Sequence, residues 1–445
     1  IGGYSGVGKS TLVNEFEQTI EKDNLQGYVI TGKSDKLERN IPYYPIIQAF
    51  EEIVQDILNT ASLVQQLRWK KRIQDAIGGI GKVLTDLIPD IEKIIGKQPE
   101  IPMISGKEAI NRFNHVFIRF ISAVATRNRP LVLFLDDLQW IDSASLSLLE
   151  NITNNGSVKH LMFIGAFRDN EIDEDHMLTK TITSIRERSL EEGRRVVFSM
   201  NLHNLSKEEV TQMIAESLNE SIEKIKDIAD IIYQKTLGNA FFARQLLRRL
   251  YEDKLIRYST YRHRWEWKKS ELASINISDN VVDLVVNKIE ALPESTREIL
   301  KIASCIGRVF DKKTIETINQ RMHTDSYDTV FNATTKHLLK SQQEGLVVLD
   351  KGRYRFAHDR IHQAVSSLNS DIFKKKVHLH IGRLLFNNAF KGQFELCDAE
   401  KLTLNSEDIF NIINHWNKGI IFIESNIEKS QLATLNLVAG KRAAS

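Results

Sequence analysis

Apolar residues form two kinds of pattern along this chain, a helical spacing and short continuous runs. Leu12, Phe16 and Ile20 are spaced four residues apart, which predicts one face of a helix near the N-terminus. Four shorter apolar runs have the length of strands: residues 27–32, 130–135, 160–166 and 195–200. Because the run 130–135 is continuously apolar, it predicts a strand buried on both faces of a parallel sheet. The first 200 residues therefore predict helices around one parallel sheet.

The rest of the chain has mainly helical periodicity. Residues 45–100 are amphipathic, and Pro89 should end or kink a helix there. Ser206, followed three residues later by Glu209, predicts a helix start, with helices continuing to about Leu255. Further features are a basic and aromatic hairpin at 256–267, helical spacing at 281–303, and a hairpin at 345–356 with its turn at Lys351-Gly352. Helices followed by a hairpin are what a winged helix needs.

Composition excludes few classes of protein or partner. The length of 445 residues is typical of roughly three domains. The 60 basic and 58 acidic side chains nearly balance, so overall charge favours neither nucleic acid nor membrane as a partner. Cys305 and Cys397 lie far apart, which fits a reducing, cytoplasmic setting. No apolar run reaches the ~20 residues of a membrane helix. The chain begins inside a motif without Met, so we expect a fragment of a longer protein.

That first motif is a P-loop, Gly-x-x-x-x-Gly-Lys-Ser, from Gly3 to Ser10. Its glycines let the backbone bring N–H groups against phosphate oxygens, and Lys9 supplies a charge for the β- and γ-phosphates. The Ser10 hydroxyl is a magnesium ligand. A helix that starts at the loop adds N–H donors and a positive dipole end. We expect ATP or ADP with Mg²⁺ here, bound by Gly3, Ser5, Gly6, Val7, Gly8, Lys9, Ser10 and Thr11.

A second motif closes the apolar run 130–135 with two carboxylates, Asp136 and Asp137. Ligands of open α/β sheets bind at this edge, so Asp136 is expected to hold the magnesium together with Ser10. Asp137 is placed to orient or deprotonate an attacking water. Many P-loop ATPases have the longer Glu there, so Asp predicts slow turnover. Arg168, at the end of the run 160–166, is a candidate sensor of the γ-phosphate; the alternative is a surface arginine paired with Asp169 or Glu171.

Several stretches together resemble one family. The run Leu133 to Asp142, Leu-Phe-Leu-Asp-Asp-Leu-Gln-Trp-Ile-Asp, is similar to the Walker B signature of STAND-type ATPases, the Orc1-like modules of large bacterial signalling proteins. Gly32 to Asp35 with Pro42-Tyr43, and Leu87 to Pro89 with Ile95-Gly96, resemble further family segments. So do Gly-Asn-Ala-Phe-Phe at 238–242, the His-Asp-Arg motif at 358–360, and the segment 432–440.

This resemblance implies an α/β P-loop NTPase with a parallel sheet, a helical lid, a winged-helix domain and the start of TPR-like helices. The corresponding divisions are 1–202 with a helical insertion at about 45–100, 203–272, 273–385 and 386–445. In relatives the lid motif contacts the nucleotide, which implicates Gly238, although Ala240 replaces the proline that lies against adenine. The winged-helix histidine of relatives reads the ADP β-phosphate, and His358 occupies that place; the alternative is a capping or core histidine.

Three hypotheses of function follow. The first is a nucleotide-dependent regulatory switch with slow ATP hydrolysis, inside a protein that also carries Ser/Thr or histidine kinase domains. Its partners would be nucleotide, and proteins or a second copy bound through the C-terminal helices, while DNA is not expected. The second is a DNA-acting ATPase of initiator or loader type that uses the winged helix. In the third, the ATPase activity is vestigial and the chain is a helical scaffold.

Overall fold

The computed structural model describes residues 1–22, 27–35, 41–102, 107–154, 158–191, 197–268, 272, 286, 288–322, 327–350, 352–390 and 406–444. The chain divides into two compact units. The first comprises Ile1–Leu25, Asp136–Gln139 and Ile164–Val285, and the second comprises Gln26–Leu135, Trp140–Phe163 and Val286–Ser445. The P-loop and the two carboxylates of the second motif, Asp136 and Asp137, therefore belong to one unit.

The predicted helix and parallel sheet are present. Helix α1 (Lys9–Lys22) begins within the P-loop. The sheet has the strand order β1 (Tyr28–Lys33), β2 (Leu131–Asp136) and β3 (Leu161–Gly165), so the strand that carries the second motif is central. All six residues of β2 are buried, as the continuous apolar run predicts. The central strand of the sheet thus ends at Asp136.

One of the four apolar runs differs from its prediction in its described residues, and another forms a strand at the edge of the sheet. The run 160–166 forms β3, but β3 lies at the edge of the described sheet and only half-buries its residues, with Met162 52% exposed. Within the run 195–200, the described residues 197–200 form no strand, and residues 195–196 lie outside the described part of the chain. A parallel bridge between Gly2 and Asn201 lies at the end of this run. In it the Gly2 N–H donates to the Met200 carbonyl at 2.8 Å, and the Leu202 N–H donates to the Gly2 carbonyl at 2.9 Å.

The second unit contains a group of helices that lies between β1 and β2 in the sequence. It consists of α2 (Tyr44–Thr60), α3 (Leu63–Ile77), η1 (Gly78–Ile80), α4 (Lys82–Leu87), η2 (Pro89–Ile91), α5 (Glu92–Ile95) and α6 (Lys107–Val124). Helix α4 ends two residues before Pro89, which opens a 3₁₀ turn, so the proline ends the helix as predicted. Phe50, Phe117 and Phe120 form an aromatic cluster between α2 and α6, which stabilises this group of helices. Beyond β2 lie η3 (Leu138–Trp140) and α7 (Ser143–Asn154).

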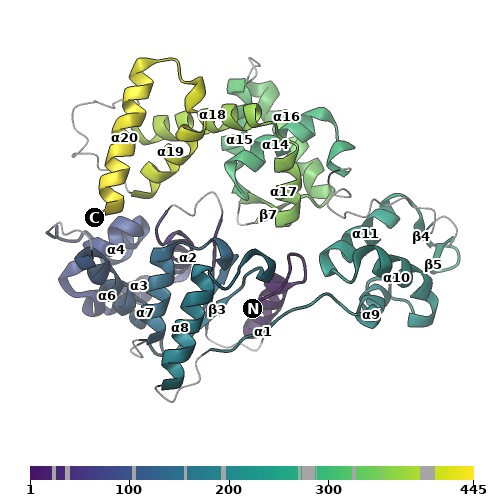
Figure 1. Ribbon diagram of the computed structural model, residues 1–445, viewed down its shortest axis with the longest axis horizontal. Helices are drawn as coiled ribbons and strands as arrows, with labels where there is room; N and C mark the ends of the chain where they lie inside the picture. Colours follow the sequence, from purple (N-terminus) through teal and green to yellow (C-terminus); the bar gives the residue numbers. More distant parts are fainter. Residues whose placement is uncertain are drawn as a thin grey trace. The chain divides into compact units, whose positions relative to one another are not determined.

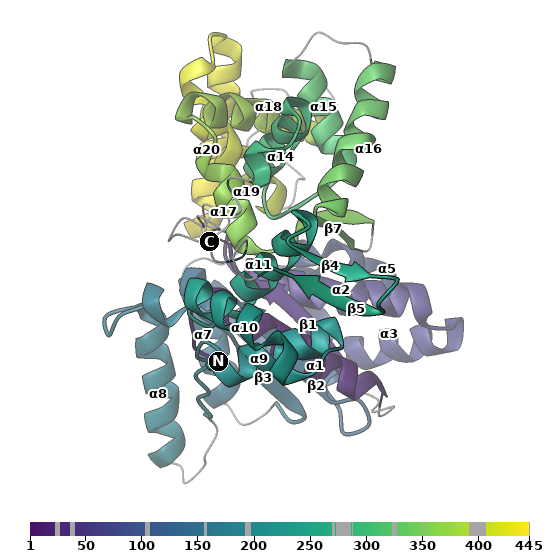
Figure 2. The same cartoon turned by 90° about the vertical axis from the view of Figure 1, so that its right-hand side faces the viewer.

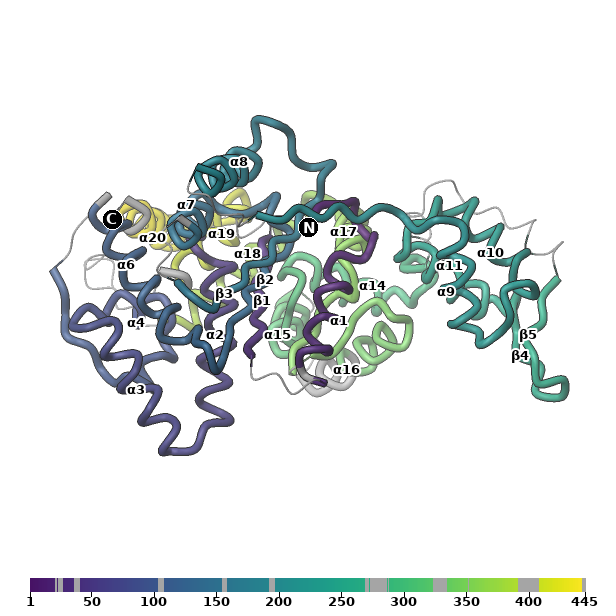
Figure 3. Tube along the Cα trace, turned by 90° about the horizontal axis from the view of Figure 1, so that it is seen from below, coloured from purple at the N-terminus to yellow at the C-terminus, as the bar shows by residue number. Residues whose placement is uncertain are grey.

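The first unit continues with η4 (Asp169–Glu171), α8 (Met177–Glu191) and a small helical bundle, the lid. The lid comprises α9 (Lys207–Leu218), α10 (Ile222–Thr236), α11 (Ala240–Glu252) and the antiparallel hairpin β4 (Ile256–Ser259) and β5 (Arg264–Trp267). Ser206 and Glu209 form the predicted capping box at the start of α9. Isoleucines and leucines of all three helices share one core, and the hairpin lies at one end of the bundle (Figures 2 and 3).

The second unit ends with two helical groups. The first comprises α14 (Glu294–Ile306), β6 (Val309–Phe310), α15 (Lys312–Met322), α16 (Tyr327–Gln343), β7 (Val347–Asp350), β8 (Arg353–Phe356) and α17 (Asp359–Ser367), with the antiparallel sheet order β6-β8-β7. The two strands of the predicted hairpin at 345–356 are therefore present. Lys351 of its predicted turn, and residues 281–285 and 287 of the helical prediction, lie outside the described residues. The second group comprises α18 (Asp371–Phe390), α19 (Ser406–Lys418), η6 (Ile420–Phe422) and α20 (Asn426–Ala444).

Helices α18, α19 and α20 lie side by side (Figure 1). Trp416 of α19 is fully buried in their shared core, and its indole N–H donates to Glu428 at 3.0 Å. Arg383 of α18 forms a two-pronged ion pair with the same carboxylate, at 2.7 and 2.8 Å. One carboxylate thus ties three helices together. Within the described residues, no helix is both long and apolar enough to cross a membrane.

Two mid-helix glycines give opposite expectations for stability. A Cβ on Gly382 of α18 would lie 3.0 Å from three atoms of Trp416, whereas a Cβ on Gly440 of α20 would meet nothing within 4 Å. We expect Gly440→Ala to raise the free energy of unfolding by about 0.5–1 kcal/mol, because alanine favours helix. Gly382→Ala should lower it, because α19 must move away. Urea unfolding of both variants measures this, and equal stabilisation by both would contradict the packing.

A buried histidine pair predicts a pH dependence of stability. Nδ1 of His378 and Nδ1 of His415 lie 2.9 Å apart between α18 and α19. Burial lowers the pKa of His378 to about 4 and that of His415 to about 3, from 6.5. The unfolded chain therefore takes up protons first as the pH falls, so the stability present above pH 6.5 is lost progressively towards pH 4. Between pH 7.5 and 5.5 the loss should be about 2–3 kcal/mol.

Urea unfolding at several pH values tests this dependence. His378→Gln with His415→Gln should flatten the slope between pH 7.5 and 5.5. His203→Gln, at an exposed position, should leave the slope intact. An unchanged slope in the double variant would assign the pH dependence to other groups.

Candidate functional site

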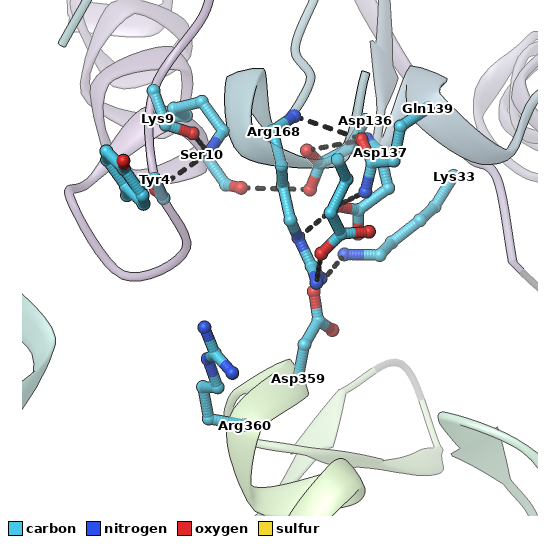
Figure 4. A network of polar contacts seen from close by, with 12 residues as sticks. Tyr4, Lys9, Ser10, Lys33, Asp136, Asp137, Gln139, Arg168, Asp359 and Arg360 are labelled. Carbon is cyan, nitrogen blue, oxygen red and sulfur yellow. Dashed lines mark hydrogen bonds and ion pairs between the residues drawn. The ribbon is translucent and has the colours of Figure 1, made fainter. Parts of the chain in front are cut away.

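The candidate site is built in the first unit from the P-loop and Asp136–Gln139, the last residue of β2 and the turn after it. Lys9 and Ser10 lie in the first turn of α1, and Thr11 follows them. The Ser10 hydroxyl donates to Asp136 Oδ2 at 2.9 Å, which joins residues 126 positions apart (Figure 4). Two hard oxygen donors, one from each motif, therefore lie within hydrogen-bond distance of each other. This donor set fits Mg²⁺, which prefers carboxylate and hydroxyl oxygens.

Lys9 is buried within the loop. Its ammonium donates to the carbonyl oxygens of Gly3 at 2.6 Å and Tyr4 at 2.9 Å. Burial lowers the pKa of Lys9 below its usual 10.5, and the nearby carboxylates of Asp136 and Asp137 oppose that shift. The charge is thus held inside the loop, where a phosphate chain would need it. This geometry fits the predicted role of Lys9.

The lid contacts the other side of the same loop. The Asn239 side-chain amide donates to the Ser5 carbonyl at 3.0 Å, and the Phe241 backbone N–H donates to the Gly6 carbonyl at 3.0 Å. Gly6 has φ 87°, and a Cβ there would lie 2.7 Å from Asn239 Oδ1. The glycine is therefore required by the lid as well as by the backbone turn. Gly238 lies one residue before Asn239 and packs against the Leu205 carbonyl.

Asp137 and Arg168 form a buried ion pair. Arg168 Nε lies 3.2 Å from Asp137 Oδ1, and Arg168 Nη1 lies 2.7 Å from Glu171. The Arg168 side chain is 2% exposed and that of Asp137 4%. Of the pairings considered from the sequence, the one with Glu171 is present, while the partner Asp137 was not foreseen. Orienting water by Asp137 and sensing phosphate by Arg168 stay predictions.

Gln139 completes this pair and was missed by the sequence reasoning. Its Nε2 donates to Asp137 Oδ1 at 2.9 Å, and its Oε1 accepts from the Arg168 backbone N–H at 3.1 Å. Asp137 adopts φ 55°, a left-handed conformation that Asp tolerates better than most residues. This turn brings the Asp137 carboxylate to Gln139. The signal was present in the run Asp-Asp-Leu-Gln-Trp, which places a bifunctional amide two residues after the acid.

His358 belongs to the second unit, where it is the N-cap of α17. Its Nδ1 accepts the backbone N–H of Arg360 at 3.1 Å, so the capping alternative is present in the structure. The neighbouring Asp359 forms an ion pair with Lys33 at 2.9 Å (Figure 4). It forms another with Arg308 at 3.0 Å. Lys33 is the last residue of β1, so the His-Asp-Arg motif ties α17 to the end of a sheet strand. The reading of nucleotide by His358 stays a prediction.

The Arg168 pair predicts a large effect on stability. Arg168→Met leaves the Asp137 charge buried without its cation, which should lower the free energy of unfolding by about 3–5 kcal/mol. Adding Asp137→Asn removes the buried charge and should restore much of that loss. The matched control is Arg186→Met, an exposed arginine bonded to Ser199, with an effect below about 0.5 kcal/mol. Urea unfolding measures all three, and additive losses in the double variant would contradict the pairing.

Comparisons with known proteins show what this chain is similar to. Residues 1–164 match the family model described as AAA ATPase domain. Hybrid signal transduction histidine kinase G of Dictyostelium discoideum is 26% identical over 543 residues, which cover all of this chain and 15% of that protein. Peroxide stress-activated histidine kinase mak3 of Schizosaccharomyces pombe is 20% identical over 479 residues, covering 96% of this chain and 18% of that protein. The chain thus spans less than a fifth of either relative.

Among solved structures, a STAND protein with a tetratricopeptide repeat sensor from Pyrococcus horikoshii is 14% identical. The matched region covers 99% of this chain and 48% of the Pyrococcus horikoshii chain, with a TM-score of 0.44. The family match includes the P-loop, Asp136 and Asp137, and ends before Arg168 and the lid. Residues 1–164 are therefore similar to an AAA ATPase domain, which agrees with the AAA ATPase part of the resemblance predicted from the sequence.

Proposed function

We propose that this chain is an ATP- and magnesium-binding regulatory switch of STAND type within a larger signalling protein. The observation that carries the proposal is the bond between Ser10 and Asp136, beside the buried Lys9. It joins the P-loop to the second motif through the two groups that a nucleotide-bound magnesium needs. When bound, Mg²⁺ would neutralise phosphate charge and polarise the terminal phosphate.

Each part of the site has a role in this proposal. Lys9 supplies positive charge to the phosphates, and the backbone from Gly3 to Gly8 supplies N–H donors. Ser10 and Asp136 hold the magnesium, and Thr11 lies at the start of the same helix. Asp137 orients the attacking water, and Arg168 responds to the γ-phosphate. Gly238 and His358 report the nucleotide to the lid and the winged helix.

Slow hydrolysis is part of the proposal. Asp137 is engaged by Arg168 at 3.2 Å and by Gln139 at 2.9 Å, so its carboxylate is restrained before any water arrives. Freeing it requires breaking a buried ion pair, which opposes rapid turnover. A site that binds firmly and hydrolyses slowly suits an output in conformation rather than in product.

The remaining assignments are also proposals. We divide the chain into an NTPase core at 1–202, a lid at 203–272, a winged helix at 273–385 and TPR-like helices from 386. The helix order and the sheet β6-β8-β7 support the winged helix. Both histidine kinase relatives support kinase domains elsewhere in the same protein. We place the protein in the cytoplasm, with protein partners or a second copy bound through the C-terminal helices.

Nucleotide binding tests the proposal directly. We expect the purified protein to retain ADP and to bind ATP in a Mg²⁺-dependent manner, with multi-turnover hydrolysis slower than about 1 s⁻¹. Lys9→Ala removes a charge-assisted contact and should weaken nucleotide binding by about 10- to 100-fold. Isothermal titration and a phosphate-release assay measure these quantities.

The control is Thr19→Ala on the same helix, an exposed hydroxyl that donates to the backbone carbonyl of Glu15 one turn earlier. It should leave affinity unchanged. Unaltered affinity in Lys9→Ala would favour a vestigial site, and turnover of many per second without a partner would exclude the slow switch. Salt-sensitive binding of duplex DNA would favour the initiator-type alternative.

A further inference from the structure

Four consecutive carbonyl groups of the P-loop are engaged, and two different parts of the protein engage them. Lys9 holds the first pair, on Gly3 and Tyr4. The lid holds the second pair, on Ser5 and Gly6, through the Asn239 side chain and the Phe241 backbone N–H. The loop conformation therefore depends on a segment more than 230 residues away in sequence.

Holding a carbonyl also orients the N–H of the same peptide unit. In a trans peptide the C=O and N–H bonds point in opposite directions. The bond from Asn239 to the Ser5 carbonyl therefore turns the Gly6 N–H away from the lid. The bond from Phe241 to the Gly6 carbonyl does the same for the Val7 N–H. Among the described residues, neither of these N–H groups donates to a protein acceptor, so both are available to an anion.

Asn239 itself has little freedom. It is 7% exposed, and its Oδ1 accepts the Phe242 N–H at 3.3 Å as the N-cap of α11. Gly238 before it has φ 78°, and a Cβ there would lie 1.9 Å from the Leu205 carbonyl oxygen, so the lid backbone is fixed on that side. One side chain thus caps a lid helix with its oxygen and holds the P-loop with its nitrogen.

We propose that Asn239 is a positioning residue through which the lid sets the phosphate affinity of the P-loop. It acts on the orientation of the Gly6 and Val7 N–H groups rather than on the base of the nucleotide. By linkage, phosphate binding must favour the engaged lid by the same factor with which the engaged lid favours phosphate. The inference rests on the proposed nucleotide-binding function and identifies the contact that couples site and lid.

Two variants separate the two bonds of Asn239. Asn239→Ser and Asn239→Asp both keep an oxygen that caps α11, and both remove the side-chain amide that donates to the Ser5 carbonyl. Asn239→Asp also places a carboxylate against the Ser5 carbonyl. The matched control is Asn204→Ala, which removes another lid-side amide, one that donates to the Leu237 carbonyl at 3.0 Å.

The probes are Mg-ATP and inorganic tripolyphosphate, which has no base. We expect Asn239→Ser to weaken binding of both by the same factor, roughly 3- to 10-fold, and Asn239→Asp to weaken it further. Asn204→Ala should bind both as the unmodified protein does. Hydrogen exchange at the start of α11 should slow when tripolyphosphate is added to the unmodified protein, and not in Asn239→Asp.

The outcomes separate this inference from the proposed function. If the unmodified protein binds ATP while both Asn239 variants bind it equally well, the inference is wrong and the proposed function stands. If ATP binding weakens while tripolyphosphate binding does not, Asn239 acts on the base and the inference is wrong. If the unmodified protein binds neither probe, both proposals are wrong.

Discussion

The first unit depends on the compensation of four charges that are removed from water together. Lys9, Asp136, Asp137 and Arg168 are between 2% and 7% exposed. A buried charge without a partner costs several kcal/mol, so two cations and two carboxylates must be placed against one another. Lys9 and Asp136 come from the two motifs, Asp137 from the turn that follows β2, and Arg168 from the segment that follows β3. This requirement fixes how the P-loop helix and two strand ends meet.

Much of this could be predicted from the sequence, because strong local signals carried it. The six apolar residues of β2 give a strand buried on both faces, and two acids at its end mark the site edge. The glycines and Lys9 identify the P-loop from its spacing alone. Helix boundaries were also predictable at Pro89 and at Ser206 with Glu209. Both signals act on the neighbouring backbone, so they do not depend on tertiary contacts. The meeting of Ser10 with Asp136 followed from combining two motifs.

The remaining features depend on neighbours that a linear pattern does not reveal. The apolar run of β3 gives no sign that the strand lies at the sheet edge, because edge position depends on which strands pair. The run 195–200 has strand composition, but its described residues 197–200 form no strand, and the bridge to Gly2 is made by the next residue, Asn201. The partner of Arg168 was taken from its near sequence neighbours, whereas Asp137 lies 31 positions away. Gln139 and Asn239 carry neutral amides. Their roles become visible only in the structure, where the partners of both the amide nitrogen and the amide oxygen are known.

The N-cap bond of His358 has a consequence for the chemistry of its ring. Because Nδ1 accepts the Arg360 backbone N–H, that nitrogen carries a lone pair and no proton. The neutral imidazole is therefore fixed as the Nε2–H tautomer. The ring then presents one N–H donor, in a direction set by the helix it caps. The cap thus engages one ring nitrogen of His358 as an acceptor and leaves the other as the donor of the ring.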